Sequence, residues 1–273
     1  MKLKFAGIRR KTEFSPNHVV NDLLIINGTG ESLKGLGADV TMYDEGVFSA
    51  DDVKEKFIFS MVQGPIGTNT LAKVENRGAV IINSPQSVKN CYRINMVTLL
   101  PAAGIPFPRS LIVATDSDVE GKEPGLNSAK IWVKRGDVHA VHKEDVTHVS
   151  TEEEKLNLLR EFHQRNITQA ILQEHVEGDT VKFYAVRESN LFHWYYLNGL
   201  YHTKFDERKL HEIATASAEA LGLFVFGGDA IIGRDGAITV IDINDWPSFA
   251  PVREKASHHI AKLIYRKAKE YSG

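Results

Sequence analysis

The sequence of 273 residues has a single cysteine, Cys91, which leaves no partner for an internal disulfide and excludes a cysteine-rich metal site. It has no uninterrupted apolar run near the ~18 residues of a membrane-spanning helix. Neither sign of charge is in excess, because 33 Lys and Arg residues balance 35 Asp and Glu residues. These absences argue against a disulfide-rich scaffold, a membrane protein and a protein whose main partner is nucleic acid.

The start of the chain, MKLKFAGIRRK, is not expected to be a secretory signal, since charge returns after too few apolar positions for an h-region of about 7–15 residues. Hydrophobic residues make up 42% of the chain and charged residues 25%, as in ordinary globular proteins. At roughly 150 residues per domain, the length predicts about two domains. We expect a cytoplasmic enzyme or binding protein without a membrane partner; the sequence does not specify its oligomeric state.

Residues 1–88 alternate between β-rich and helical patterns, which is typical of a parallel sheet covered by helices. Strands are predicted at Leu3–Ile8, Asp39–Tyr43, Phe57–Met61 and Ala79–Ile82. Ser15 and Pro16 favour the start of a helix, because Ser is a good N-cap and Pro suits the first helical position. That helix is expected to end near residues 35–37.

Residues 89–273 form the second predicted unit. Helical periodicity over Val88–Ala103 ends at Gly104, a typical helix stop. Further helices are expected over residues 151–165, 207–220 and 252–271. Strands are expected at residues 110–114, 130–134, 170–174, 181–187, 191–197, 223–233 and 237–244, with a surface loop over 116–128.

The last two strands carry the strongest chemical signal. Asp235 and Gly236 between two β-rich runs predict a hairpin with a two-residue turn. In that register position 231 pairs with 240, and Asp229 lies directly opposite Asp242, with Cβ atoms ~5 Å apart. Asn244 shares their face, whereas residues 241 and 243 point to the other face.

Directly opposed carboxylates destabilise a sheet unless something compensates their charge. A divalent cation would do so, because Mg²⁺ binds carboxylate and amide oxygens. Asp229, Asp242 and Asn244 are therefore candidate ligands for Mg²⁺, with Mn²⁺ as a substitute. The alternative is a polar face in water, and a β-bulge near residues 227–228 would shift the register.

Three basic residues are candidates for contacts with phosphate. Lys134 ends a β-rich run, Lys182 alternates with apolar β-residues, and Arg93 stands near the start of a predicted helix. A lysine among apolar strand residues needs a partner if it is partly buried. Each of them could instead be an ordinary surface charge.

From about Asn83 to the last helix, the motifs of this chain and their order resemble those of the ATP-grasp superfamily. The segment 92–108 is similar to the helix that carries a phosphate-binding basic residue, here Arg93, before a GIPxP turn. The strand ending at Lys134 is similar to the one whose lysine contacts the α- and β-phosphates. Asp229 and the Asp242-x-Asn244 pattern match the metal triad of the superfamily.

The resemblance implies an α/β (α+β) ATP-grasp fold. Residues 1–88 would form the parallel α/β domain that precedes the core, and residues 89–273 the core, with a lid subdomain at about 108–172. The linker 173–179 is similar to the segment that holds adenine through backbone groups and ribose through a carboxylate, Glu177 or Asp179. The implied ATP-binding residues are Arg93, Lys134, His139, Gln173, Glu174, His175, Val176, Glu177, Asp179 and Lys182.

Two departures from the superfamily pattern stand out. Residues 134–142 replace a glycine-rich lid loop, so a shorter phosphate cover that uses His139 or His142 is expected. The metal motif is Asp-x-Asn instead of Glu-x-Asn. Together with Arg93 and Lys182, this form is similar to the inositol-phosphate kinases of the superfamily.

The resemblance therefore implies an ATP- and Mg²⁺-dependent enzyme, with Lys182 and Arg93 as catalytic residues that neutralise charge on the transferred phosphoryl group. The first hypothesis is a carboxylate ligase that forms a carbon–nitrogen bond through an acyl phosphate. The second is a small-molecule kinase acting on a polyanion such as an inositol phosphate. A non-catalytic ATP-binding protein is the third.

The acceptor is expected to be an anionic small molecule or peptide. Arg10 and Lys11 follow the first strand, and open α/β sheets bind ligands at the carboxyl ends of their strands. Ser248, just beyond the metal-binding strand, is a further candidate contact. The alternative for the basic pair is a solvated loop.

Overall fold

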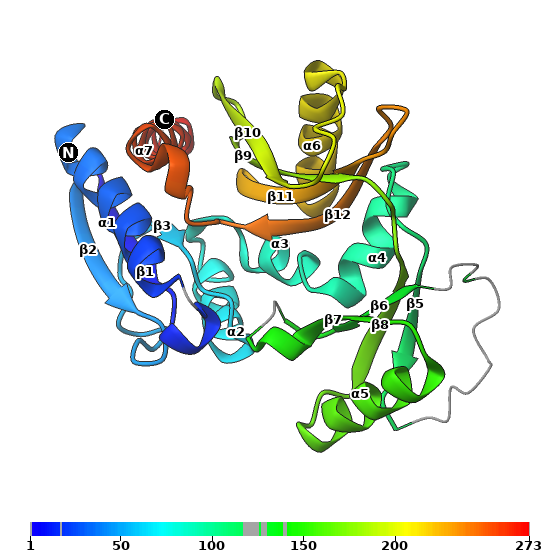
Figure 1. The fold of residues 1–273 in the computed structure, drawn as a ribbon. Coiled ribbons are helices and arrows are strands. Elements are labelled where there is room, and N and C mark those ends of the chain that lie inside the picture. The colour runs from blue at the N-terminus through cyan, green and yellow to red at the C-terminus, as the bar shows by residue number, and fades with distance from the viewer. Residues whose placement is uncertain (1, 17, 117–125, 127–129, 139–140, 273) are drawn as a thin grey trace.

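The computed structural model describes residues 2–16, 18–116, 126, 130–138 and 141–272. The strands of these residues form three four-stranded sheets, each with helices packed against it (Figure 1). Within the same residues, no helix is both long and apolar enough to cross a membrane. The candidate site lies where these sheets approach one another.

The first sheet is parallel, in the order β2-β1-β3-β4. Its strands are β1 Lys4–Arg9, β2 Asp39–Asp44, β3 Phe57–Ser60 and β4 Val80–Ile82. Side chains alternate along β1, so Phe5 packs on one face and Ile8 on the other. Two helices, α1 (Val19–Gly35) and α7 (Arg253–Ser272), cover the first face, and α2 (Pro65–Glu75) covers the second (Figure 1). The predicted parallel α/β arrangement is confirmed.

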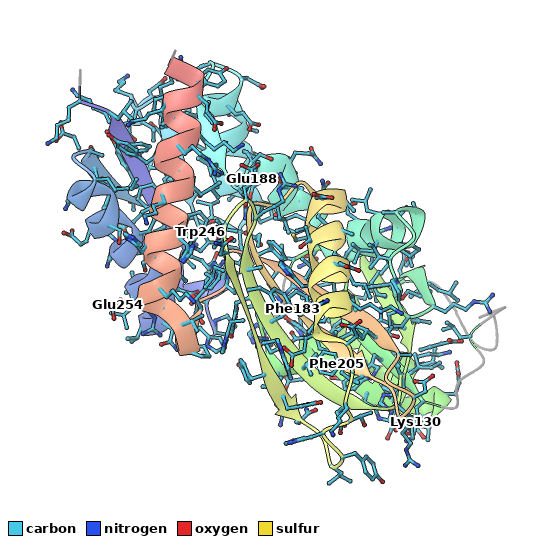
Figure 2. All side chains as sticks on the ribbon, turned by 90° about the horizontal axis from the view of Figure 1, so that it is seen from above. Lys130, Phe183, Glu188, Phe205, Trp246 and Glu254 are labelled. Carbon is cyan, nitrogen blue, oxygen red and sulfur yellow. The ribbon has the colours of Figure 1, made fainter. Side chains whose placement is uncertain are left out.

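The second sheet is antiparallel, in the order β10-β9-β11-β12. Its strands are β9 Asp179–Val186, β10 Leu191–Asn198, β11 Val225–Ile232 and β12 Ile238–Asp245. On β9, Val181 and Phe183 pack toward α4 (Arg93–Ala102) and α6 (Glu207–Leu221). Figure 2 shows Phe183 beside α6 and Trp246, which follows β12, beside α7. Because side chains alternate, Lys182 points away from α6.

The third sheet is also antiparallel, in the order β5-β8-β6-β7. Its strands are β5 Ser110–Ala114, β6 Ile131–Arg135, β7 Val146–Val149 and β8 Gln169–Glu174. One face is covered by α5 (Glu152–Gln164), which buries Leu159 and Phe162 against the strands. Thr151 accepts a hydrogen bond from the Glu154 N–H, and Glu154 accepts in return from the Thr151 N–H, so the predicted helix start is confirmed.

The predicted helix over Val88–Ala103 is wrong, because the chain forms two helices there. The first, α3, spans Pro85–Asn90, and α4 begins at Arg93. Tyr92 between them is extended, and its hydroxyl donates to the Gln63 carbonyl, which turns the ring inward. The apolar pattern runs through this break, so periodicity alone does not reveal it.

The first helix begins at Val19, four residues after the Ser15 predicted to cap it. The Ser15 hydroxyl instead donates to the carboxylate of Asp22, so it does not satisfy the first backbone N–H groups. Residues Thr12–Phe14 form a short 3₁₀ turn, η1, before it. Two other such turns are η2 at Lys143–Asp145 and η3 at Ala250–Val252.

The predicted pairing of Asp229 with Asp242 is confirmed, but the register around it differs from the prediction. Ile231 pairs with Thr239 instead of residue 240, because the chain turns through residues 233–237 and not through two residues. A bulge that leaves Ile241 unpaired then restores the predicted register. Contrary to expectation, Ile241 lines the same cavity as Asp242.

Candidate functional site

Three strands of the second sheet place a row of charged side chains next to one another. The register sets Asp229 on β11 between Lys182 on β9 and Asp242 on β12. The Lys182 ammonium lies 2.9 and 3.1 Å from the two carboxylate oxygens of Asp229. Burial is the largest single effect on the pKa of Lys182 and lowers it, but the Asp229 and Asp242 carboxylates and Tyr195 together raise the pKa above its ordinary value, so the ammonium stays charged.

The next row on the same face consists of Tyr184, Gly227 and Asn244. A Cβ at position 227 would lie 2.9 Å from Pro247 Cγ and 3.0 Å from Tyr184 Cδ1, so glycine leaves the room that these rings occupy. Within the described residues the Asn244 side chain makes no hydrogen bond, and its amide remains available to a ligand. Sequence reasoning missed Tyr184 and Gly227, which only the pairing of distant strands places here.

A cavity of about 420 Å³, the inter-sheet cavity, lies between this row and the third sheet. Eight predicted site residues line it: Arg93, Lys134, Gln173, Glu174, His175, Val176, Asp229 and Asp242. Sequence reasoning missed its apolar side chains, among them Trp132, Ile231 and Leu197. The cavity combines apolar walls with three carboxylates and two cations, as sites for charged, partly aromatic ligands do.

The ammonium of Lys134 is buried at the end of β6. It lies 2.6 Å from Gln173 Oε1 and 3.5 Å from the Ile241 carbonyl, and within the described residues it contacts no carboxylate. Burial lowers the pKa of Lys134 to about 8, against a smaller opposing effect of Asp242. A bound anion would remove this penalty, so Lys134 is well suited to hold one.

The guanidinium of Arg93 connects the row to the segment after β6. Its Nη2 lies 3.8 Å from Asp242 Oδ2, and its Nη1 lies 3.4 Å from the Val138 carbonyl. Its Nε is buried and has no hydrogen-bond partner among the described residues. An orphaned buried donor of this kind calls for a further acceptor in the cavity.

Asp229, Asp242 and Asn244 offer the oxygen donors that Mg²⁺ or Mn²⁺ prefers. Among the described residues no group of three or more His, Cys, Asp or Glu could hold a metal ion, so a cation here depends on Asn244 and on ligand oxygens as well. The donor set fits such a cation, although Lys182 engages both oxygens of Asp229. Cation binding therefore requires Lys182 to move toward another anion, such as a phosphate.

The linker between β8 and β9 has a different arrangement from the one expected for ribose binding. Glu177 is exposed, and its Oε1 lies 2.9 Å from the Nζ of Lys130 and 3.3 Å from the Nε2 of His175. Asp179 accepts hydrogen bonds from the Tyr201 and Thr203 N–H groups, and the Thr203 bond is the main cause that lowers its pKa. Neither carboxylate lines the inter-sheet cavity. Their ribose-binding role stays a prediction.

His175 is held by a contact that the sequence did not suggest. The indole Nε1 of Trp132 donates to its Nδ1 at 3.0 Å, and His148 packs edge-on against both rings. Two members of this cluster, Trp132 and His175, line the inter-sheet cavity.

The segment after β6 is held by a buried carboxylate that sequence reasoning also missed. Asp145 accepts hydrogen bonds from the N–H groups of Val141 and His142 and from Arg135 and Arg165. Burial alone would raise the pKa of Asp145, but these donors together lower it to about 2. His139, predicted to contact phosphate, lies outside the described residues.

A second cavity of about 190 Å³, the N-terminal cavity, lies on the other side of the charged row. Lys182, Gly228 and Asn244 form its wall on the sheet, and Arg10 and Ser248, both predicted substrate contacts, also line it. Lys11, the third predicted contact, does not line it and pairs with Glu13 at 2.8 Å. Lys182 lines the N-terminal cavity and its partner Asp229 lines the inter-sheet cavity, so the two cavities meet on either side of this ion pair.

Arg10 is already occupied by the protein. Its guanidinium donates to Asp22 at 2.8 Å, to the Met61 carbonyl at 3.0 Å and to the Trp246 carbonyl at 3.2 Å. These bonds tie the loop after β1 to the end of β12. Arg10 is therefore placed to shape the N-terminal cavity, with little capacity left for an anion.

No protein-family model and no curated protein matches the sequence. Solved structures match almost the whole chain. D-alanine–D-alanine ligase from Bacillus anthracis, complexed with ATP, is similar with a TM-score of 0.71 at 13% identity, over 98% of this chain and 99% of that one. D-alanine–D-alanine ligase from Coxiella burnetii is similar with a TM-score of 0.74 at 14% identity, over 99% and 97%.

A RimK domain ATP-grasp protein from Sphaerobacter thermophilus DSM 20745 is similar with a TM-score of 0.70 at 14% identity, over 96% of this chain and 99% of that one. At such identities the likeness is one of fold and says nothing by itself about substrates. The three matches agree with the fold that the sequence resemblance implies. The chain has the fold of the ATP-grasp superfamily.

Proposed function

We propose that the protein is an ATP- and Mg²⁺-dependent carboxylate ligase that forms a carbon–nitrogen bond through an acyl phosphate. The observation that carries this proposal is the meeting of two cavities at the Lys182–Asp229 pair. One cavity suits a nucleotide and the other a small acceptor, so a phosphoryl group could pass between them at this pair. The ATP-grasp fold supports the same conclusion, since the solved ligases named above share it.

In this proposal the inter-sheet cavity binds ATP. Trp132, Ile231 and Ile241 offer apolar surface for the adenine ring. Lys134 and Arg93 lie at the end of the cavity near Asp242 and would hold the phosphates. Binding of the phosphates would give the buried Lys134 ammonium an anionic partner and would give the Arg93 Nε a hydrogen-bond acceptor.

Asp229, Asp242 and Asn244 would hold Mg²⁺, which when bound neutralises phosphate charge and aligns the phosphoryl group. Lys182, released from Asp229, would neutralise the charge that develops on the transferred phosphoryl group. A carboxylate oxygen of the acceptor attacks the γ-phosphorus and ADP leaves. An amine then attacks the resulting acyl phosphate and inorganic phosphate leaves. The protein contributes positioning and electrostatic stabilisation.

We also propose that the enzyme acts in the cytoplasm. Its test is the fate of the γ-phosphate of labelled ATP in the presence of carboxylates and amines. Label released as phosphate only when a carboxylate and an amine are both present supports the ligase. Label retained on the acceptor would identify a kinase, and nucleotide binding without turnover would identify a non-catalytic ATP-binding protein.

A further inference from the structure

A third cavity adjoins the N-terminal cavity and has no role in the chemistry described so far. This outer groove of about 350 Å³ lies at the carboxyl ends of β1 and β2, beside the start of α1. It shares Arg10, Ser15 and Asp22 with the N-terminal cavity. A ligand in the smaller cavity would therefore lie next to the outer groove.

One stripe of α1 forms an apolar wall of the outer groove. Val19, Asp22, Leu23 and Ile26 all line it, at the spacing i, i+3, i+4 and i+7 that places residues on one helix face. Leu23 keeps 37% of its surface exposed, so it is accessible to a ligand in the outer groove. The stripe thus offers apolar contact with one carboxylate, Asp22, in its middle.

Most charged groups of the outer groove are already engaged within the protein. Arg9 pairs with Asp44 at 3.1 Å, and Lys11 pairs with Glu13 at 2.8 Å. Glu45 accepts hydrogen bonds from the N–H groups of Lys11 and Gly64. These groups have little left to offer a charged ligand.

Asp22 is different. Its side chain is only 6% exposed, and both Arg10 and Ser15 donate to the same oxygen, Oδ2, at 2.8 and 2.6 Å. Within the described residues Oδ1 accepts no hydrogen bond, and Asp22 lines both cavities. A nearly buried carboxylate oxygen without a donor fits a ligand ammonium, which would form a charge-assisted hydrogen bond.

We infer that the carboxylate substrate is an amino acid with a large apolar side chain, an inference that rests on the proposed ligase function. Its carboxylate would lie in the N-terminal cavity toward Lys182 and Asn244, and its ammonium on Asp22 Oδ1. Its side chain would lie in the outer groove against Val19, Leu23 and Ile26. Asp22 is then a specificity residue, because it disfavours carboxylates that lack an ammonium.

The inference is tested by calorimetric titration of the whole protein, saturated with Mg²⁺ and a non-hydrolysable ATP analogue. The ligands are both enantiomers of leucine and of alanine, and 4-methylpentanoate, which is leucine without its ammonium. One leucine enantiomer should bind at least about tenfold more tightly than either enantiomer of alanine. It should also bind at least about tenfold more tightly than 4-methylpentanoate. Equal binding of alanine would overturn the side-chain assignment, and equal binding of 4-methylpentanoate would overturn the role of Asp22. Absence of leucine binding would overturn both.

Two variants at neighbouring positions of α1 distinguish a loss of ligand binding in the outer groove from a general effect on the helix. Leu23→Glu places a charge in the outer groove and should weaken leucine binding about tenfold or more, with alanine binding unchanged. Leu24→Glu is the matched control, because Leu24 is 48% exposed on the same helix and does not line the groove. Equal losses in both variants, or none in Leu23→Glu, would refute the inference.

Nucleotide binding, measured in the same titrations without amino acid, reports on the proposed function separately. If the ATP analogue binds and leucine does not, the substrate assignment fails and the ligase proposal stands. If the ATP analogue does not bind, the proposed function fails.

Discussion

The change Lys134→Met should stabilise the protein while it weakens nucleotide binding. The Lys134 pKa is lowered from 10.5 to about 8, so keeping this buried ammonium charged at pH 7 costs about 3 kcal/mol. Methionine removes that cost and forfeits the hydrogen bond to Gln173, which is worth about 1 kcal/mol. The net gain is about 2 kcal/mol, or roughly 4–8 °C in Tm.

The pH dependence of this stability gain shows whether the buried charge of Lys134 causes it. Since the folded-state pKa of Lys134 is below its unfolded value, this group's contribution to stability rises as pH rises through about 8 and levels off near 10.5. The advantage of Lys134→Met in thermal melts should therefore be largest at pH 7 and vanish near pH 10. Lys130→Met is the control, because Lys130 is 53% exposed and its replacement should change stability little.

The same variant loses the cation that we assign to the phosphates of ATP. Titration with the ATP analogue at pH 7 should show a loss of affinity of at least about tenfold, whereas Lys130→Met should retain affinity. A Lys134→Met protein that melts below the wild type at pH 7 would refute the reasoning about burial. One that binds the analogue normally would refute the assignment to phosphate.

Two further changes test the structure around the site. Asp145→Asn removes the charge that Arg135 and Arg165 share and should cost about 3 kcal/mol in urea denaturation; a loss under 1 kcal/mol would show that the network does not hold this segment. Gly178→Ala should lower Tm by several degrees, because Gly178 has a φ of 156° and a Cβ there would lie only 2.2 Å from the Ile232 carbonyl oxygen. Gly35→Ala, in a helix with nothing near the added Cβ, should not lower it.

The part of the site that could be predicted from sequence is the part determined by local pattern. The alternation of side chains between the two faces of β11 and β12, with a turn between the strands, was enough to predict that Asp229 lies opposite Asp242. Two errors cancelled in that prediction, because the turn is longer than expected and the bulge at Ile241 compensates for it. Turn length and bulge depend on packing that a pattern does not encode.

The rest of the site depends on contacts between segments far apart in the chain. The pairing of Lys182 with Asp229 follows from the position of β9 beside β11, which no local signal specifies. Asp179 was a candidate ribose-binding carboxylate of the linker, and no local signal indicated that the residue 199–203 loop folds over it and supplies its donors. Arg10 likewise was predicted to bind an anion, but its guanidinium donates hydrogen bonds to Asp22 and to the Trp246 carbonyl after β12, and neither contact has a local signal in the sequence.

The order of elements was easier to predict than their ends. Most strands and the long helices lie where alternation and helical periodicity placed them. The C-terminal helix was also predicted, yet its packing on α1 and the first sheet could not be, since an amphipathic helix does not identify its partner. This packing joins the two ends of the chain and places Trp246 between the sheets.

The dependence of ATP turnover on Asp242 tests the central claim most directly. The change Asp242→Asn removes one charge from the row with little change in shape, so the melting temperature should stay within a few degrees of the wild type. Mg²⁺-dependent release of phosphate from ATP, measured with a carboxylate and an amine present, should fall to background. Turnover at the wild-type rate with the same Mg²⁺ dependence would contradict the account.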